Sequence, residues 1–409
     1  MKALHNLLDG LRPSFQEGGK LRRFWVVFDA LETFAFTPGH VTHDGVHVRD
    51  GIDLKRTMFL VIVALLPALV FGTWNQGYQY HLSIGEADAT LWENFAVGLW
   101  KVIPLIVVSY GVGLGIEFFF AGLRGHAINE GFLVSGMLIP LVMPVDVPLW
   151  MVAIAVAFAV VIAKEVFGGT GMNIINIALT ARAFLFFAYP KQLSGEIWIH
   201  DIAASKAAGV AVDGYTGATA LGHLANTVGK PMTDPEVTGI MSMFTDTGMF
   251  SFMNAFIGTI PGSIGETSAL AILIGAAILI FTGIGSWKIM LSFLAGGLAM
   301  GAIFNGLALN AYMTLPPLHH IVLGGFMFGM VFMATDPVTA SATETGKWIY
   351  GFFGGLFSIL IRVFNPAYPE GVMMAILFMN VLAPLIDYYV IQASVNRRTK
   401  RVAARVSAA

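Results

Sequence analysis

The stretch "GFLVSGMLIPLVMPVDVPLWMVAIAVAFAVVIA", residues 131–163, decides the fold class of this chain. Asp146 is its only charged side chain, and Pro144 and Pro148 on either side of it divide the stretch into two apolar segments. A membrane-spanning helix needs roughly 20 apolar residues, and fewer where it lies inside a bundle. The pattern therefore predicts two membrane helices, of which the first breaks early at "MPVDVP".

The whole chain shares this apolar character. It has 409 residues, of which 56% are hydrophobic and 12% charged, and its mean hydropathy is +0.74. This composition is typical of polytopic membrane proteins. The chain has no cysteine, which excludes disulfides, cysteine-ligated iron–sulfur clusters and thiolate metal sites. The net charge is -2, and no basic patch interleaved with aromatic residues suggests a nucleic-acid partner.

Ten segments along the chain resemble membrane spans, so we expect an all-α polytopic protein. They begin near Thr57, Phe95, Gly131, Pro148, Asn173, Ser268, Ile289, His319, Trp348 and Gly371.

The distribution of basic residues predicts the orientation. With the N-terminus in the cytoplasm, eight Lys and Arg residues before the first span, four in loops and five in the tail make 17 of 23 inside. The positive-inside rule favours this orientation, with both termini cytoplasmic. The first 20 residues lack the apolar core of a signal peptide.

We expect five regions. They are a cytoplasmic arm with an interfacial segment (1–56), a first five-helix half (57–189), a non-cytoplasmic loop (190–267), a second five-helix half (268–393) and a basic cytoplasmic tail (394–409). Five spans lie on each side of the long loop. If the two halves are related, they are therefore inverted with respect to each other.

Local echoes support the repeat: "GFLVSGM" resembles "GFMFGM", and "FGGTG" resembles "FGGLF". The third and eighth spans both break early, at "MPVDVP" and "TDPVTA". Broken spans in matching positions point to an ion or ligand site at the midplane. Close helix packing through Gly and Pro is the alternative explanation.

Three histidines of the arm, His40, His43 and His47, lie in "HVTHDGVHVRD". Glycine and β-branched residues favour an extended arm there, without fixed ligand geometry, so we expect no metal site.

The motif "DGYTGATALG", residues 213–222, is unusually polar for this chain. The hydroxyls of Thr216 and Thr219 can be esterified, and small neighbours such as Gly217 leave the backbone open to a modifying enzyme. The carboxylate of Asp213 could bind a metal or orient the backbone. By itself the motif is weak evidence, because Gly, Thr and Asp are common in turns.

The motif resembles Asp-Gly-x-(Ser/Thr)-Gly-Ala-Thr, in which a phosphoester joins the last Thr to FMN. Four further segments, "KEVFGGTGMNIINIALTARAFLFFAYP", "GSIGETSALAILIGAA", "LGGFMFGMVFMATDPVTAS" and "NPAYPEGVMMAILFMNVLAPLIDYYV", resemble the family of B subunits of the sodium-translocating NADH:quinone oxidoreductase. The resemblance covers essentially the whole chain. It departs at Met172 and Ile177, where a basic residue and a proline are more usual.

The resemblance implies a covalent FMN at Thr219 on the outer side, a non-covalent riboflavin in the bundle and ubiquinone reduced near the cytoplasmic face. It implies Na+ as the transported ion, a bacterial inner membrane with its lipid as surroundings, and a flavin transferase for maturation. No Rossmann fingerprint is present, so we expect partner subunits to oxidise NADH and deliver the electrons. The resemblance implies that other subunits also supply iron–sulfur centres.

Asn173, Asn176 and Thr180, at i, i+3 and i+7, are expected to form a polar stripe on the fifth helix. The stripe would suit an isoalloxazine edge, or helix–helix hydrogen bonds. A cation inside a span, such as Arg182, costs about 2.5–3.5 kcal/mol on insertion scales. Arg182 therefore either faces the flavin phosphate or an oxygen-rich cavity, or pairs with a carboxylate of another helix.

Carboxylates near bends are the candidates for the ion path. The resemblance assigns Glu130, Asp336 and Asp387 to ion uptake and transfer, and helix-end carboxylates are the alternative. Carboxylates serve Na+ and protons alike, so the sequence leaves the ion open. We expect Glu165 to pair locally with Lys164.

The resemblance places the quinone head group near the N-terminal arm and the loop "RGHAINEG", which nominates Phe28, Arg124 and His126. An aromatic arm of this kind is also typical of a subunit contact. The sequence leaves four points open: the quinone type, the riboflavin ligands, the gating of the ion and the role of Glu117.

Three other functions are alternatives. The D subunit of an Rnf-type ferredoxin:NAD oxidoreductase shares the motif, but the long arm before Thr57 argues against it. A channel or secondary transporter with an inverted repeat would need no flavin-acceptor loop. A haem subunit would need facing histidines from separate spans, whereas His319 and His320 are neighbours.

Overall fold

The computed structural model describes residues 2–408 except 17, 23–24, 37–41, 43, 49–53, 125–130 and 213, and these residues form helices and no strand. This confirms the all-α prediction. The helices that build the bundle and the arm are α1 (Lys2–Phe15), α2 (Trp25–Ala35), α3 (Leu54–Ser83), α4 (Leu91–Arg124), α5 (Phe132–Leu141), α6 (Leu149–Phe158), α7 (Ile177–Ala188), α12 (Ala269–Phe281), α13 (Trp287–Leu307), α14 (Pro317–Val322), α15 (Phe326–Phe328), α16 (Glu344–Phe364) and α17 (Val372–Ala408). Short π and 3-10 segments are η2 (Ala159–Lys164), η3 (Glu165–Phe167), η4 (Pro190–Gln192), η5 (Ala311–Thr314) and η6 (Gly329–Met333). The long loop carries α8 (Ile202–Ala207), α9 (Ala220–Ala225), α10 (Pro235–Ser242) and α11 (Phe252–Ile257).

Each predicted span coincides with a helical segment. Among the described residues, six segments are long and apolar enough to cross a membrane: α3, α4, Leu149–Phe167, α13, α16 and α17. The helices α5, α7 and α12 are apolar but shorter, and the predicted eighth span is divided into α14, α15 and η6. The chain is thus a multi-pass membrane protein, while the number of complete spans stays a prediction.

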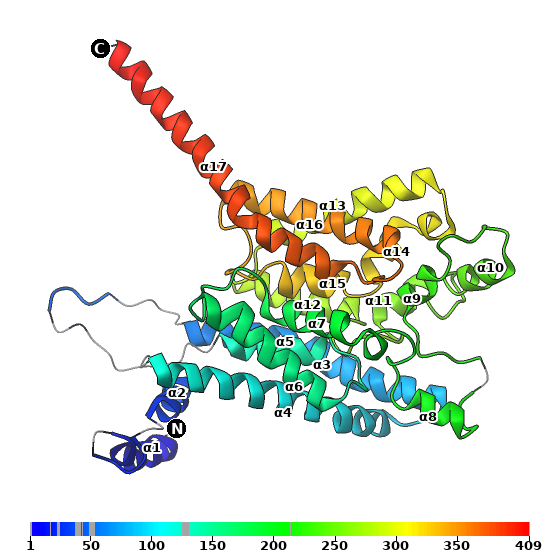
Figure 1. Ribbon diagram of the computed structural model, residues 1–409, viewed down its shortest axis with the longest axis horizontal. Helices are drawn as coiled ribbons and strands as arrows, with labels where there is room; N and C mark the ends of the chain where they lie inside the picture. Colours follow the sequence, from blue (N-terminus) through cyan, green and yellow to red (C-terminus); the bar gives the residue numbers. More distant parts are fainter. Residues whose placement is uncertain are drawn as a thin grey trace.

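The bundle helices run roughly side by side, and the two ends of the chain lie at the same end of the bundle (Figure 1). Helices α8, α9 and α10 lie at the opposite end (Figure 1). The loop 190–267, which carries "DGYTGATALG", and the N-terminal arm therefore lie at opposite ends of the bundle (Figure 1). The charge distribution predicts that the N-terminal arm lies on the cytoplasmic side, and this orientation stays a prediction.

The two halves pack in similar ways. Helix α4 contacts α5 and α6 in the first half, as α13 contacts α14 and α16 in the second. Helix α6 contacts α7, as α16 contacts α17, and α3 contacts α12 between the halves. These contacts suit two related halves, and the inverted repeat itself stays a prediction.

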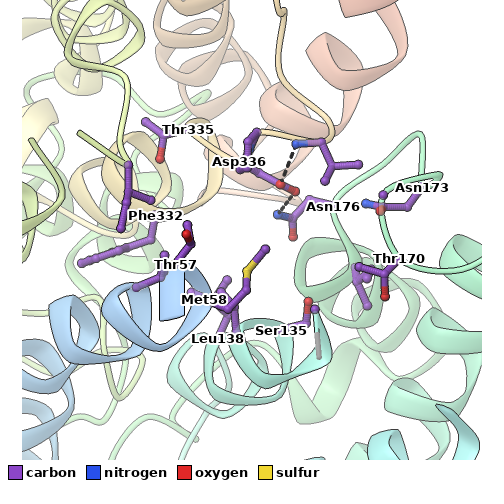
Figure 2. A pocket seen from close by; sticks show the side chains of 18 of the residues that line it. Thr57, Met58, Ser135, Leu138, Thr170, Asn173, Asn176, Phe332, Thr335 and Asp336 are labelled. Carbon is purple, nitrogen blue, oxygen red and sulfur yellow. Dashed lines mark hydrogen bonds between the residues drawn. The ribbon is translucent and has the colours of Figure 1, made fainter. Parts of the chain in front are cut away.

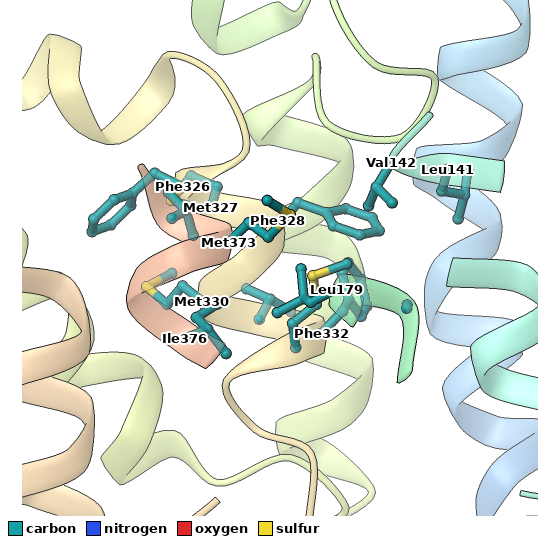
Figure 3. Close-up of a cluster of buried hydrophobic side chains, with 14 of the residues drawn as sticks. Leu141, Val142, Leu179, Phe326, Met327, Phe328, Met330, Phe332, Met373 and Ile376 are labelled. Atoms are coloured by element: carbon teal, nitrogen blue, oxygen red, sulfur yellow. The ribbon is translucent and has the colours of Figure 1, made fainter. Parts of the chain in front are cut away.

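Both predicted breaks are present. Helix α5 ends at Leu141, and Val142 and Met143 after it are fully buried without helical structure. In the second half, η6 ends at Met333, one residue before "TDPVTA". Irregular backbone at membrane depth is tolerated where protein covers it. Figure 3 shows this cover: the ring of Phe328 lies against Val142 within a cluster of buried apolar side chains.

A third irregular stretch, residues 260–268, is buried just before α12. Side chains of α3 satisfy its carbonyl groups: Asn75 Nδ2 donates to Ile260 O at 3.0 Å and Gln76 Nε2 to Gly262 O at 3.0 Å. These bonds matter because an unpaired carbonyl in an apolar interior is costly.

The N-terminal arm forms two helices. Phe28 of α2 is buried and stacks on Phe15 of α1 with ring centroids 4.7 Å apart, and Arg12 forms an ion pair with Glu32. Helix α2 also contacts α4. The arm therefore docks on the bundle, and its place at a membrane surface stays a prediction.

Candidate functional site

Thr219 begins helix α9. It is the N-cap residue, and its Oγ1 accepts a hydrogen bond from Gly222 N at 3.1 Å. Earlier in the motif, Thr216 Oγ1 accepts from Ala218 N at 3.2 Å. A side chain at the buried Gly217 would collide with the Glu196 carbonyl oxygen, which explains why glycine occupies this position. Asp213 lies outside the described residues.

Thr219 lines two cavities at this end of the bundle. The larger, here called the Thr219 cavity, has a volume of about 280 Å³. Its lining includes Phe186, Trp198 and Tyr368, with Arg182 as the cation. The smaller has a volume of about 20 Å³, sufficient for one water molecule. The Thr219 hydroxyl thus lies beside an aromatic-walled space.

Arg182 connects three elements beneath this cavity. Its Nη1 donates to Glu266 Oε1 at 2.7 Å, and its Nη2 lies 3.8 Å from Glu370 Oε2, in the turn between α16 and α17. The three side chains are only 6%, 7% and 13% exposed. Arg182 thus pairs with carboxylates, as one of the two sequence interpretations expected, but both carboxylates belong to irregular segments and not to another helix. The guanidinium also lines the Thr219 cavity.

Several hydroxyls around these carboxylates lack a hydrogen-bond partner among the described residues. Ser263 Oγ and Thr267 Oγ1 both line the smaller cavity beside Glu266. The hydroxyl of the buried Tyr368 is also without a partner. Buried polar groups are normally satisfied, so this part of the molecule is suited to ordered water or to a polar ligand.

His223 lies one turn after Thr219 in α9. Burial lowers the pKa of His223 below its usual value, although the charge of Glu196 acts in the opposite direction. Its Nε2 is buried and has no partner among the described residues. The ring is therefore neutral near pH 7 and available as a hydrogen-bonding group close to Thr219.

A second candidate site, here called the interior cavity, lies between the two halves (Figure 2). Its volume is about 90 Å³, and it is lined by parts of α3, α5, η2, α12 and η6 and by residues 170–177. Asp336 lies on its wall and accepts hydrogen bonds from Asn176 Nδ2 at 3.4 Å, Val338 N at 3.1 Å and Thr339 Oγ1 at 3.0 Å. The bond from Asn176 joins the first half of the chain to the second.

The predicted polar stripe on the fifth helix is wrong. Helix α7 begins at Ile177, because Asn176 is its N-cap and accepts from Leu179 N at 3.1 Å. Asn173 precedes the helix, and Thr180 Oγ1 donates to Asn176 O at 2.7 Å. Asn173 and Asn176 nevertheless line the interior cavity together, whereas Arg182, within α7, lines the Thr219 cavity.

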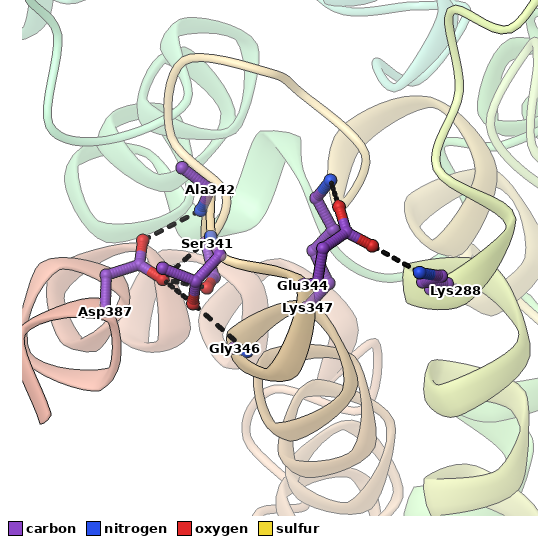
Figure 4. A network of polar contacts seen from close by, with 8 residues as sticks. Lys288, Ser341, Ala342, Glu344, Gly346, Lys347 and Asp387 are labelled. Carbon is purple, nitrogen blue, oxygen red and sulfur yellow. Dashed lines mark hydrogen bonds and ion pairs between the residues drawn. The ribbon is translucent and has the colours of Figure 1, made fainter. Parts of the chain in front are cut away.

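Asp387 of α17 anchors the start of α16 (Figure 4). It accepts from Ser341 Oγ at 2.5 Å, Ala342 N at 2.8 Å, and Thr343 N and Oγ1 at 3.0 and 2.5 Å. Thr343 is in turn the N-cap of α16. This geometry matches the helix-end alternative, and the ion-path role of Asp387 stays a prediction.

The expected local pair between Lys164 and Glu165 is wrong. Glu165 Oε2 accepts from Arg124 Nη1 at 2.8 Å, and Lys164 forms an ion pair with Glu117 of α4. Neighbouring helical residues point in different directions, and here each reaches a different part of α4. Lys164 also ends the π-helix η2.

The remaining candidates are placed as follows. Glu130 and His126 lie outside the described residues. Of the quinone candidates, Phe28 packs within the arm and Arg124 is engaged by Glu165. The structure brings together no quinone site from these described residues.

Three charged side chains inside the bundle were not singled out from the sequence: Glu266, Glu370 and Arg362. Arg362 is fully buried in α16 and donates to His320 O at 2.6 Å and Leu323 O at 3.2 Å, where α14 ends. A charge among apolar residues was the available signal for Arg362 and Glu266.

Comparison with known proteins gives a consistent result. The family model described as the NQR2, RnfD, RnfE family matches residues 41–396. The chain is similar to the B subunit of the Na(+)-translocating NADH-quinone reductase of Chromohalobacter salexigens, with 45% identity over 98% of this chain and 97% of that protein. The B subunits of the same enzyme from Stutzerimonas stutzeri and Klebsiella pneumoniae are 45% and 44% identical, over 96% and 97% of this chain and 98% and 99% of theirs.

Proposed function

This chain belongs to the NQR2, RnfD, RnfE family, and from this premise we propose that it is the flavin-carrying membrane subunit of a Na(+)-translocating NADH-quinone reductase. The relatives that are B subunits of this enzyme match over nearly their whole length, which favours this role over that of the Rnf-type D subunit. Other subunits of the complex oxidise NADH and deliver electrons. The chain lies in the inner membrane of a bacterium with both termini in the cytoplasm.

The observation that carries the proposal is the setting of Thr219. It is the last threonine of "DGYTGAT", and its side chain lies on the wall of a 280 Å³ cavity with Trp198, Tyr368 and Phe186. Aromatic walls suit a planar ring system. Thr219 Oγ1 would hold FMN through a phosphoester, formed by a flavin transferase, and Arg182 would face the phosphate.

FMN supplies reversible electron transfer when it is attached. The residues of this chain fix its place: Thr219 provides the tether, and the Glu266–Arg182–Glu370 cluster sets the charge beside it. The neutral His223 adds a hydrogen-bonding group in the same helix.

We assign the non-covalent riboflavin to the interior cavity. The amides of Asn173 and Asn176 and the hydroxyl of Ser135 line it and suit the polar edge of an isoalloxazine. A volume of about 90 Å³ accommodates an edge of the ring rather than the whole. Ubiquinone is proposed to bind at the N-terminal arm, and Na+ to move past Asp336.

The test is in-gel flavin fluorescence of the denatured subunit. We expect a fluorescent band from the wild type, none from Thr219→Val, and a retained band from Thr216→Val, a matched control three residues away. Fluorescence that survives Thr219→Val, or a dark wild-type band from active complex, would refute the attachment.

A further inference from the structure

Lys164 is a buried cation that the proposed function does not use. Its side chain is 2% exposed, and it ends the π-helix η2 in the first half of the chain. Single π-helical turns within α-helices occur frequently at functional sites. Ionisable groups at membrane depth normally face a cavity or each other, and Lys164 does both.

The partner of Lys164 is Glu117, which is 5% exposed on α4. Apart from this ion pair, neither the ammonium nor the two carboxylate oxygens has a hydrogen-bond partner among the described residues. A buried pair with so few additional bonds is weak evidence for stability alone. By contrast, Glu165, the next residue, has its carboxylate and its carbonyl bonded by Arg124.

Lys164 also lines the interior cavity. The other charged side chain among the described lining residues is Asp336, whose carboxylate already accepts three hydrogen bonds. The cavity thus has one carboxylate, Asp336, from the second half of the chain and one ammonium, Lys164, from the first half. The ammonium has Glu117 as its single ionic partner among the described residues.

We propose that Lys164 stabilises negative charge on a planar aromatic ligand in the interior cavity, and that Glu117 balances the ammonium while the ligand is neutral. This inference rests on the proposed function, which places a flavin there. When bound, the ligand would gain one electron from the FMN proposed at Thr219. No bond forms or breaks and no proton moves, because the ammonium offsets the added charge. Charge near the ring nitrogens tunes flavin potentials.

The experiment is a spectroelectrochemical titration of the non-covalent flavin in purified complexes that carry Thr219→Val, so that covalent flavin on this chain does not contribute. In this background, Lys164→Gln should make the one-electron potential more negative, because the cation is lost. Glu117→Gln should make it more positive, because the ammonium loses its counter-charge. Lys164→Arg should stay near the parent value, and so should Glu165→Gln, the matched control.

The opposite signs exclude a purely structural role, which would shift both variants in the same direction or not at all. Unchanged potentials in Lys164→Gln and Glu117→Gln would overturn this inference alone. If Lys164→Gln does not assemble, the Glu117→Gln variant alone tests the inference. A more positive potential would support it, and a more negative potential would overturn it. A wild-type complex that releases no flavin on denaturation would instead overturn the placement of riboflavin in the proposed function.

Discussion

Replacing Arg182 with methionine tests how the cluster beneath the Thr219 cavity is held together. The guanidinium is 6% exposed and pairs with Glu266 at 2.7 Å and Glu370 at 3.8 Å. Arg182→Met removes the cation but leaves two carboxylates close together in a buried site. Removal of one partner from a buried ion pair costs about 3–5 kcal/mol. We expect the upper part of this range, because Glu266 and Glu370 then repel each other.

The assay is unfolding of the detergent-purified chain by titration with sodium dodecyl sulfate, followed by circular dichroism. Arg182→Met/Glu266→Gln should recover part of the lost free energy, because one of the uncompensated charges is gone. The control is Lys206→Met, which breaks the Lys206–Glu196 pair, of similar length at 2.6 Å but solvent-exposed. An exposed pair contributes about 0–1 kcal/mol.

Equal losses for Arg182→Met and Lys206→Met would refute the reasoning, since they would mean that the Arg182 cluster is hydrated and screened. Failure of Arg182→Met/Glu266→Gln to recover any stability would also contradict it. In that case the methionine would act through packing rather than through charge.

Three further predictions concern the supporting contacts. Asp387→Ala leaves two backbone amides at the start of α16 without their acceptor and should lower the unfolding free energy by about 2–4 kcal/mol, with faster amide exchange at residues 342–346. Burial raises the pKa of Asp146, but the hydrogen bonds from His200 and the Asp201 amide, together with the charges of His200 and Lys101, lower it by more, so the pKa is below its ordinary value. The resulting stabilisation is complete above about pH 4 and is lost as the pH falls further. Proteolysis of the loop 190–267 should therefore accelerate in acid in the wild type but vary little with pH in Asp146→Asn. Asn75→Ala leaves the Ile260 carbonyl unpaired and should destabilise the chain by about 1–3 kcal/mol in the same unfolding titration, whereas an unchanged midpoint would show that water replaces the amide.

Hydropathy predicted the helical segments of this chain because each is stabilised by its own backbone hydrogen bonds and apolar surface. The early end of α5 followed from the prolines and Asp146 of "MPVDVP", which interrupt an apolar helix locally. The break before Asp336 followed in the same way from "TDPVTA". Such signals are local in sequence, so sequence reasoning detects them.

Contacts between segments were less predictable. The pairing of Lys164 with Glu117 depends on the π-helical turn that rotates the end of η2, and composition carries no sign of that turn. The polar stripe failed because the Asn176 side chain starts α7 instead of lying along it. Arg182 was recognised as a buried cation, but the choice of Glu266 as its partner depends on the fold of residues 260–268.

Mass spectrometry of the proteolytic peptide that contains Thr219 tests the central claim most directly. The account predicts that this peptide, from active complex, is heavier by the mass of FMN less one water, and that fragmentation places the addition on Thr219. An unmodified Thr219 in fully active complex, or the flavin on another residue of the peptide, would contradict it.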